Sequence, residues 1–326
     1  MSDASRPGLR TLAERRGFRI GTCVSAMPLH GDTRYAEALA REFNVLTPEN
    51  AMKFGPLSPE PGIYDFTEAD AIVDFALAHE MDVRGHVLVW YAQLPRWLER
   101  SRPTRAELVD VLTRHIATVV GRYAGRIRTW DVVNEAIATD GSFRETLWQK
   151  TIGAEYLDIA FHAARAADPS ALLFYNDYGV EATGAHADAV SALLRDLRAR
   201  NIPVDGVGLQ MHVRLDQPVD CRTLQTNMQR LADLGLRVQV TECDVRIPIA
   251  QRPTDAQLSR QAEVYRSVLQ ASLRIPGCDC LGLWGFTDRH SWVTHFFPGE
   301  GAALLLDEDY RAKPAYHALA TVLSEG

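Results

Sequence analysis

Two glutamates stand at the ends of short hydrophobic runs and could act as a catalytic pair. Glu135 ends the run Trp130-Asp-Val-Val-Asn-Glu, and Glu242 lies in Val238-Gln-Val-Thr-Glu-Cys-Asp. Hydrolysis of a glycosidic bond uses two carboxyl groups, one that donates a proton and one that attacks the sugar or activates water. A single glutamate at a strand end is about as often a structural ion-pair partner as a catalytic group. Two glutamates that face each other favour the catalytic interpretation.

Polar side chains also follow the other strand-like runs. If these runs form one barrel, their carboxyl ends meet on one face, where barrel enzymes keep their active sites. Nothing comparable follows the helical segments, so this asymmetry predicts one polar cleft. The residues that we expect to converge there with the two glutamates are Glu49, Asn50, His86, Gln93, Asn134, Asn176, Asp177, Gln210, His212 and Asp244.

Three tryptophans fit the same cleft. Trp90, Trp284 and Trp292 lie at or just beyond strand ends, where an indole face can stack on the apolar face of a sugar. Packing in the core is the default for any single tryptophan, and we assign it to Trp130 and Trp148. Carboxylates, amides and indoles together favour a carbohydrate substrate.

A metal site is the competing interpretation, because imidazoles and carboxylates at strand ends could also bind a cation. The first strand-like run has no His-x-His pair, and the chain has no His-Glu-x-x-His or Cys-x-x-Cys spacing. It also has no glycine-rich phosphate loop and no Gly-x-Ser-x-Gly elbow. We therefore expect neither a metal nor a cofactor.

The elements that must position these residues alternate along the chain. Segments with helical spacing, such as Leu108, Leu112 and Val119, separate short apolar runs, and a last helix is expected over Lys313–Leu323. The expected strands are Phe18–Val24, Phe43–Leu46, Val83–Val89, Thr129–Val133, Leu172–Tyr175, Gly206–Leu209, Val238–Val240 and Cys280–Gly285. Eight strands that alternate with helices predict an α/β fold, a single (β/α)8 TIM barrel, with an open doubly wound sheet as the competitor.

The composition is that of an ordinary globular protein. The 326 residues are 46% hydrophobic and 24% charged with a net charge of −7, which argues against disorder and against nucleic acid as a partner. No apolar run is long enough for a membrane span, and no signal peptide is visible. The chain would be cytoplasmic if complete and secreted if an export signal was removed. Five cysteines, an odd number, favour free and mostly buried thiols.

Seven motifs follow one another in a characteristic order. They are Leu46-Thr-Pro-Glu-Asn-Ala-Met-Lys53, Arg84-Gly-His-Val-Leu-Val-Trp90, Trp130-Asp-Val-Val-Asn-Glu135, Asn176-Asp-Tyr178, Asp205-Gly-Val-Gly-Leu-Gln-Met-His212, Thr241-Glu-Cys-Asp244 and Leu283-Trp-Gly-Phe-Thr-Asp288. In this order the chain resembles glycoside hydrolase family 10, the catalytic domain of endo-β-1,4-xylanases. The resemblance extends from Leu9 to Tyr316, nearly the whole chain.

The resemblance implies a role for each matching residue. Glu135 would be the acid/base catalyst and Glu242 the nucleophile of a retaining enzyme. Asn134 would contact the sugar 2-hydroxyl, while His212, bridged to Asp244, would hold the carboxylate of Glu242. The glycone side of the cleft would be lined by Glu49, Asn50, Lys53, His86, Trp90 and Gln93. Gln210, Trp284 and Trp292 would close around the sugar next to the scissile bond.

These roles carry physical expectations. Hydrogen-bond donors around Glu242 should lower its pKa so that it stays ionised. Burial and nearby negative charge should raise the pKa of Glu135 so that it keeps its proton. A retaining mechanism places the two carboxyl groups about 5–5.5 Å apart.

Three residues depart from the family pattern. Tyr91 stands where histidine is usual, Phe54 where tryptophan is common, and Cys243 where leucine or methionine follows the nucleophile. The first two bear on substrate preference. Cys243 should point away from Glu242 into the barrel packing, because side chains alternate along a strand.

The resulting expectation is a cofactor-free endo-β-1,4-xylanase that acts on xylan or xylo-oligosaccharides. We expect one catalytic domain over residues 1–326, with the barrel proper at about 7–324, no binding module, and a monomer without nucleic-acid or membrane partners. An enzyme of the same family that trims short xylo-oligosaccharides or aryl glycosides is the nearest alternative. A metal-dependent barrel hydrolase and a non-catalytic carbohydrate-binding protein are the alternatives from other classes.

Overall fold

The computed structural model describes residues 7–249 and 252–325 and contains a closed barrel of eight parallel strands. Each barrel strand pairs with the next, and β9 pairs with both β8 and β1, which closes the ring. The barrel strands are β1 (Arg19–Val24), β2 (Val45–Pro48), β3 (Asp82–Gly85), β4 (Thr129–Asn134), β5 (Leu172–Asp177), β6 (Gly206–Leu209), β8 (Arg237–Pro248) and β9 (Cys280–Leu283). The predicted (β/α)8 TIM barrel is therefore confirmed, and the doubly wound sheet is excluded.

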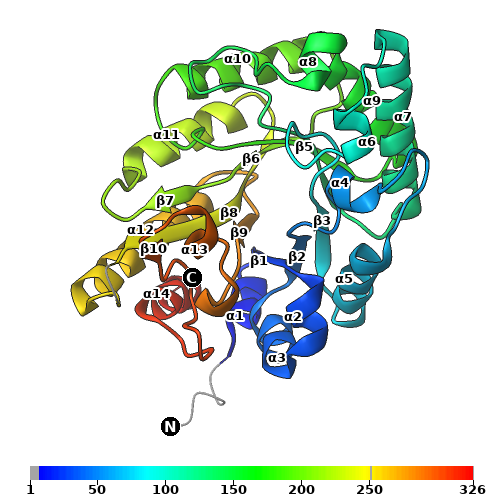
Figure 1. Cartoon of the computed structure of the whole chain (residues 1–326). Helices are drawn as coiled ribbons and strands as arrows, with labels where there is room; N and C mark the ends of the chain where they lie inside the picture. The colour runs from blue at the N-terminus through cyan, green and yellow to red at the C-terminus, as the bar shows by residue number, and fades with distance from the viewer. Residues whose placement is uncertain (1–6, 250–251, 326) are drawn as a thin grey trace.

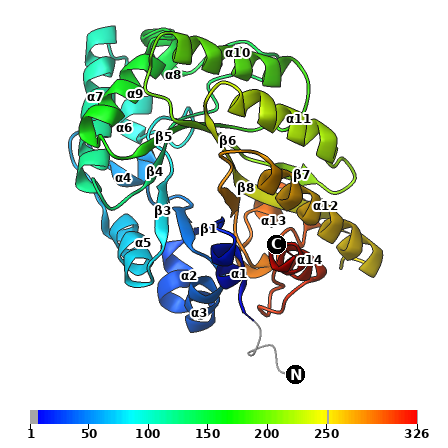
Figure 2. The ribbon, with the colours of Figure 1, turned by 180° about the vertical axis from the view of Figure 1, so that it is seen from behind.

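Helices surround the ring of strands in both views (Figures 1 and 2). The longer ones are α3 (Thr33–Glu42), α5 (Thr67–Ala78), α7 (Arg105–Arg122), α9 (Tyr156–Ala167), α10 (Ala185–Ala199), α11 (Cys221–Ala232), α12 (Asp255–Arg274) and α14 (Pro314–Ser324). Shorter segments are α1 (Leu9–Arg15), α2 (Ala26–Gly31), α4 (Phe54–Leu57), α6 (Arg96–Glu99), α8 (Leu147–Thr151), α13 (Val293–Phe296) and the 3-10 turn η2 (Asp288–His290). The last helix agrees with the prediction to within a residue at each end.

Local sequence explains where the two longest helices begin. Thr104 caps α7 and Thr254 caps α12, and in each case the third helical residue, Glu107 or Gln257, bonds back to the cap. This reciprocal arrangement satisfies amide groups that the first helical turn leaves without partners. Both helices then bury one apolar face against the barrel.

Strand ends differ most from the sequence prediction on the side that carries the polar residues. β3 ends at Gly85, four residues earlier than expected, and only Val89 pairs further on, with Val133. β8 runs to Pro248 rather than Val240, because its second half pairs with the short strand β7 (His212–Arg214). Glu300–Gly301, as β10, adds an antiparallel pair on β8. Such pairing between distant segments has no signature within the strand itself.

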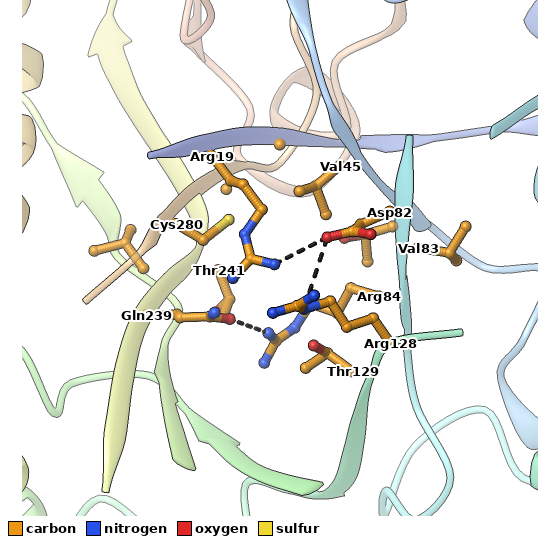
Figure 3. Close-up of a pocket in the computed structure, with 14 residues that line it drawn as sticks. Arg19, Val45, Asp82, Val83, Arg84, Arg128, Thr129, Gln239, Thr241 and Cys280 are labelled. Atoms are coloured by element: carbon orange, nitrogen blue, oxygen red, sulfur yellow. Dashed lines mark hydrogen bonds and ion pairs between the residues drawn. The ribbon is translucent and has the colours of Figure 1, made fainter. Parts of the chain in front are cut away.

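Charged and amide side chains fill the base of the barrel (Figure 3). Arg84 pairs with both carboxylate oxygens of Asp131, and its Nη1 donates to Gln239 Oε1 at 2.7 Å. Gln239 in turn donates to Asp279, which also pairs with Arg19. These buried groups satisfy one another, as polar groups removed from water must.

No helix among the described residues is long and apolar enough to cross a membrane. All five cysteines are free thiols, and Cys23, Cys243, Cys278 and Cys280 are buried. The prediction of free, mostly buried thiols is confirmed.

Candidate active site

One cleft of about 650 Å³ opens at the carboxyl ends of the barrel strands. It gathers the site residues predicted from the sequence except Asn176, Asp177 and Asp244, which are fully buried; Asp244 lies beneath His212. The predicted residues that line it are Glu49, Asn50, Lys53, His86, Trp90, Gln93, Asn134, Glu135, Gln210, His212, Glu242, Trp284 and Trp292. Side chains that are up to 243 residues apart in sequence therefore share one cavity.

Glu242 lies on β8 with its carboxylate held from two sides. Asn176 Nδ2 donates to Oε1 at 2.6 Å, and His212 Nε2 lies 3.3 Å from Oε2. Burial alone would raise the pKa of Glu242. The hydrogen bond from His212, with the charges of His86 and His212, outweighs burial and keeps the pKa below its ordinary value. This carboxylate is therefore ionised at neutral pH.

His212 is itself fixed by a buried carboxylate. Its Nδ1 lies 2.9 Å from Asp244 Oδ2, which also accepts a hydrogen bond from Trp292 Nε1 at 2.8 Å. Burial would lower the pKa of His212, but the charges and hydrogen bonds of Asp244 and Glu242 raise it to about 10. His212 is thus a cation that donates to both carboxylates.

Glu135 follows β4 directly and has a left-handed backbone with φ of 56°. This conformation costs a residue with a side chain about 1–3 kcal/mol and persists only where neighbours hold it. Two neighbours do so here. Arg144 Nε donates to the Glu135 carbonyl at 3.0 Å, and Tyr175 Oη accepts from the amide of Ala136 at 3.1 Å.

Glu135 is 8% exposed, and its surroundings favour the protonated form of its carboxyl group. Burial raises its pKa, and the negative charges of Asp177 and Glu242 add to that effect, while a hydrogen bond from Gln210 partly offsets it. Oε1 accepts from Asn134 Nδ2 and from Gln210 Nε2, both at 2.9 Å. Because Oε1 takes both amide donors, the acid proton belongs on Oε2.

Asn176 connects Glu242 to Asn134, which in turn donates to Glu135. The sequence analysis expected it near the cleft as a strand-end residue but gave it no role. Its Nδ2 donates to Glu242 and also to Asn134 Oδ1 at 2.9 Å, while Thr241 Oγ1 donates to its Oδ1 at 2.7 Å. The side chain is fully buried, so it does not line the cleft. Its position in the motif Asn-Asp-Tyr at the end of β5 is the only sequence signal that could have identified it.

Polar groups from the loops after β2 and β3 form another wall of the cleft. Lys53 Nζ donates to Asn50 Oδ1 at 3.0 Å and lies 4.9 Å from the ring centre of Trp90, and Gln93 contacts the same oxygen at 3.4 Å. Burial lowers the pKa of Lys53 and raises that of Glu49, although the two charges oppose these shifts. Here a cation and several hydrogen-bond partners lie next to an indole face.

His86 and Trp284 meet at the floor of the cleft. Their rings are 5.1 Å apart at 72°, and His86 Nδ1 lies 3.0 Å from Asp131 Oδ2. Asp131 connects this histidine to Arg84 and so to the polar network in the base of the barrel. The imidazole is therefore held rigidly from below.

The three departures from the family pattern occupy different places. Tyr91 lines the cleft and packs beneath Arg144, whose guanidinium carbon is 4.5 Å from the ring centre. Phe54 is buried outside the cleft and stacks on His115 at 3.7 Å. Cys243 is buried in the hydrophobic core, as strand alternation predicted.

Several cleft residues were not predicted from the sequence. Phe296, the last residue of α13, and Phe297, which follows it, line the cleft, and the guanidinium carbon of Arg246 of β8 lies 4.2 Å from the ring centre of Phe297. Tyr178 and Glu181 line the cleft beyond β5. Since aromatic residues in loops have no periodic pattern, only the folded chain shows which of them face the cavity.

The site pairs a carboxyl group whose pKa is lowered, Glu242, with one whose pKa is raised, Glu135, in a cleft lined by indoles and amides. Carboxyl groups in opposite protonation states can cleave a bond by combined acid and nucleophilic or base catalysis. No cluster of three or more His, Cys, Asp and Glu residues among those described is arranged to hold a metal ion.

Comparison with known proteins gives a consistent result. The sequence model of glycosyl hydrolase family 10 matches residues 8–322. Endo-1,4-beta-xylanase B of Thermotoga neapolitana is 41% identical over 319 residues, 97% of this chain and 92% of the relative. An endo-1,4-beta-xylanase of Agaricus bisporus is 36% identical over 315 residues, 95% of this chain and 93% of the relative.

Solved structures agree. Xylanase 10B from Thermotoga petrophila RKU-1, crystallised with xylobiose, superposes with a TM-score of 0.96 at 42% identity and covers 98% of each chain. Penicillium canescens endo-1,4-beta-xylanase XylE superposes with a TM-score of 0.94 at 35% identity, and the match covers 97% of each chain.

Proposed function

The chain belongs to glycosyl hydrolase family 10, and we propose that it cleaves xylan or xylo-oligosaccharides as a retaining endo-β-1,4-xylanase. The family is the one that the motif order resembles, so that prediction is confirmed. The activity named for the relatives supports a glycoside hydrolase of the xylanase type. The xylobiose in the Thermotoga petrophila complex supports a xylo-oligosaccharide as substrate.

In the first step Glu135 Oε2 gives its proton to the glycosidic oxygen as the bond from that oxygen to the anomeric carbon breaks. The carboxylate of Glu242 attacks the same carbon from the opposite face and forms a covalent glycosyl ester. In the second step Glu135, now ionised, takes a proton from a water molecule. That water attacks the anomeric carbon and releases Glu242, and two inversions give net retention.

The opposite electrostatic environments of the two carboxyls carry this proposal. Glu242 has a cationic donor, His212, on one oxygen and the Asn176 amide on the other. Glu135 is buried beside the negative charges of Asp177 and Glu242, which raise its pKa and favour its protonated form. Two carboxyl groups whose pKa values are pushed apart in one cleft identify the acid and the nucleophile.

The remaining cleft residues would bind the sugar chain. Trp284 and Trp292 would stack on the sugar next to the scissile bond, while Asn134 would contact its 2-hydroxyl. The polar wall formed by Glu49, Asn50, Lys53 and Gln93, with His86 and Trp90, would bind the glycone. We also propose that residues 7–324 form one catalytic barrel that acts as a monomer.

Azide products from two variants test the roles of the carboxyls. Glu242→Ala should lose turnover of xylan, and with an activated aryl xylobioside and azide it should give the inverted α-glycosyl azide. Glu135→Ala should still form the glycosyl-enzyme from such a substrate, and azide should then give the β-glycosyl azide. Glu37→Ala, an exposed glutamate on α3, should behave as the unmodified enzyme. If Glu242→Ala kept most of its activity on xylan, the assignment would be wrong.

Product analysis over time separates the remaining alternatives. Random internal cuts in linear xylan support the endo-xylanase, whereas stepwise release from short oligosaccharides supports the trimming enzyme. Absence of any reducing-sugar release would support a carbohydrate-binding protein. Loss of activity after exhaustive chelation would support a metal-dependent hydrolase.

A further inference from the structure

A buried aspartate and histidine lie behind Glu135 and do not touch the cleft, although the charge of Asp177 already acts on Glu135. Asp177 ends β5 and is fully buried, and His186 on α10 is 7% exposed. His186 Nε2 lies 3.4 Å from Asp177 Oδ1, which is the distance of an ion pair rather than of a well-formed hydrogen bond. Neither residue lines the cleft.

The partners of His186 determine where its protons are. Nδ1 lies 3.0 Å from the carbonyl oxygen of Ala138, and a carbonyl can only accept, so Nδ1 carries a hydrogen. In a neutral ring Nε2 would then present its lone pair to Asp177, whose ionised oxygens also only accept. Such a contact is repulsive in a buried site. The geometry therefore requires one proton to be shared between Nε2 and the carboxyl of Asp177.

A second contact connects Asp177 to the acid/base residue. Tyr175 Oη donates to Asp177 Oδ2 at 2.5 Å and accepts from the amide of Ala136 at 3.1 Å. Ala136 directly follows Glu135, whose left-handed backbone needs support from its neighbours. His186, through Ala138, holds the same loop two residues further on. The pair thus connects to both ends of the segment that follows Glu135.

Other titratable and charged groups surround the pair on every element packed against it. The ring of Tyr178 stacks on that of His186 with the ring centres 5.1 Å apart. The backbone N–H of Tyr178 donates to Asp177 Oδ1 at 2.9 Å. Arg144 donates to Tyr178 Oη at 2.7 Å. Other titratable groups coupled electrostatically to Asp177 or Glu135 include Tyr156 of α9, Glu181, Glu242, Lys53 and Tyr91.

We propose that Asp177 and His186 are positioning residues that share one proton, and that the ionised Asp177 aims Glu135 and extends its protonated range to higher pH. This proposal rests on the acid/base role assigned to Glu135 above. His186 serves to keep Asp177 ionised in a place where burial would otherwise favour its neutral form. The negative charge of Asp177 then opposes ionisation of Glu135, and its oxygen accepts from Tyr175.

Asp177→Asn tests the charge without changing the shape. The amide oxygen can still accept from Tyr175, and the amide nitrogen can donate to a neutral His186, but the hydrogen bond from the backbone N–H of Tyr178 is lost. Without the negative charge, Glu135 should lose its proton more readily, so the alkaline limb of kcat/KM should move down by about one pH unit. If kcat/KM fell equally at every pH and the limb stayed in place, Asp177 would be merely structural.

Substitutions of His186 separate charge from packing. His186→Gln removes the cation, so Asp177 should bind a proton more readily and the alkaline limb should again move down, by less than in Asp177→Asn. His186→Lys keeps a cation and should restore the limb towards that of the unmodified enzyme. His162→Lys, at an exposed histidine of α9, is the matched control and should change nothing. If the alkaline limb of kcat/KM lay at the same pH in His186→Gln and His186→Lys, the proposal would be overturned.

The protonation of His186 can be followed without any substrate. In the unmodified protein, ¹⁵N NMR should show both ring nitrogens protonated, with a titration above the ordinary value of about 6.5. In Asp177→Asn the ring should become neutral with its hydrogen on Nδ1. His186→Gln assigns the signal. If His186 titrated near its ordinary pKa in both the unmodified protein and Asp177→Asn while xylan was hydrolysed normally, the proposed role of the Asp177–His186 pair would be overturned and the proposed function would stand. The expected titration in a protein that does not cleave xylan would instead overturn the proposed function.

Discussion

Gly208 of β6 offers a sharp test of how the carboxylate of Glu242 is held. It faces the barrel interior beneath the amide that binds Glu242. A Cβ at this position would lie 2.1 Å from Asn176 Oδ1 and 2.7 Å from Thr241 Cγ2, where an ordinary contact begins at 3.4 Å. Asn176 would have to move by more than an ångström in Gly208→Ala.

Such a movement would break the 2.6 Å hydrogen bond between Asn176 Nδ2 and Glu242 Oε1. A hydrogen bond to a charged group contributes about 1.5–3 kcal/mol. If that stabilisation is lost in the transition state, kcat/KM should fall about 10- to 100-fold. Overpacking should also lower the free energy of unfolding by about 1–3 kcal/mol.

Gly206 on the same strand provides the matched control. A Cβ there would lie 2.4 Å from the ring of Phe174, one layer away from the carboxyl network. Gly206→Ala should therefore lose a similar amount of stability while the folded enzyme keeps its kcat/KM. The assay is hydrolysis of an aryl xylobioside at a temperature where denaturant titration shows both variants folded.

Two outcomes would refute this reasoning. Full activity in folded Gly208→Ala would show that Asn176 does not determine the position of Glu242. Equal loss of activity in Gly206→Ala would show that the effect is a general distortion of the barrel rather than a local one.

Two further predictions concern buried charges. His212→Gln removes the cation that keeps the pKa of Glu242 low. The pKa of Glu242 should therefore rise, and the acidic limb of the pH profile of kcat/KM should move to higher pH. An unchanged acidic limb would contradict the role of His212. Asp131→Asn leaves Arg84 buried without its anionic partner and should lower the free energy of unfolding by about 3–5 kcal/mol in a denaturant titration. Asp110→Asn, which breaks an exposed pair with Arg114, should leave stability nearly unchanged.

Much of the fold follows from local pattern. All eight barrel strands were predicted, because a strand buried on both faces needs a short apolar run, and these runs alternate with segments of helical period. The ends of β3 and β8 were misplaced. Where a strand stops depends on how long its neighbour continues beside it, and β8 extends only because His212–Arg214 comes to lie against it.

The sequence predicted the candidate site residues where a polar or charged side chain stands at the end of a strand. Glu135 and Glu242 stand at such positions, and so do His212 and Gln210. Asn176 was noted as a strand-end residue without a role, because a single asparagine in a sequence gives no indication of the two side chains that it will join.

The sequence by itself determined the barrel, the face that carries the polar residues and the two carboxyls. The resemblance assigned the acid role to Glu135, and the tertiary structure decided the physical reason, which is that the pKa of Glu135 is raised and that of Glu242 lowered. Both are glutamates that follow strands, and their intrinsic pKa values are the same. They differ because His212 and Asn176 lie against Glu242, whereas Glu135 is buried beside Asp177. Protonation depends on burial and on charges from several strands, and these come together only in the folded barrel.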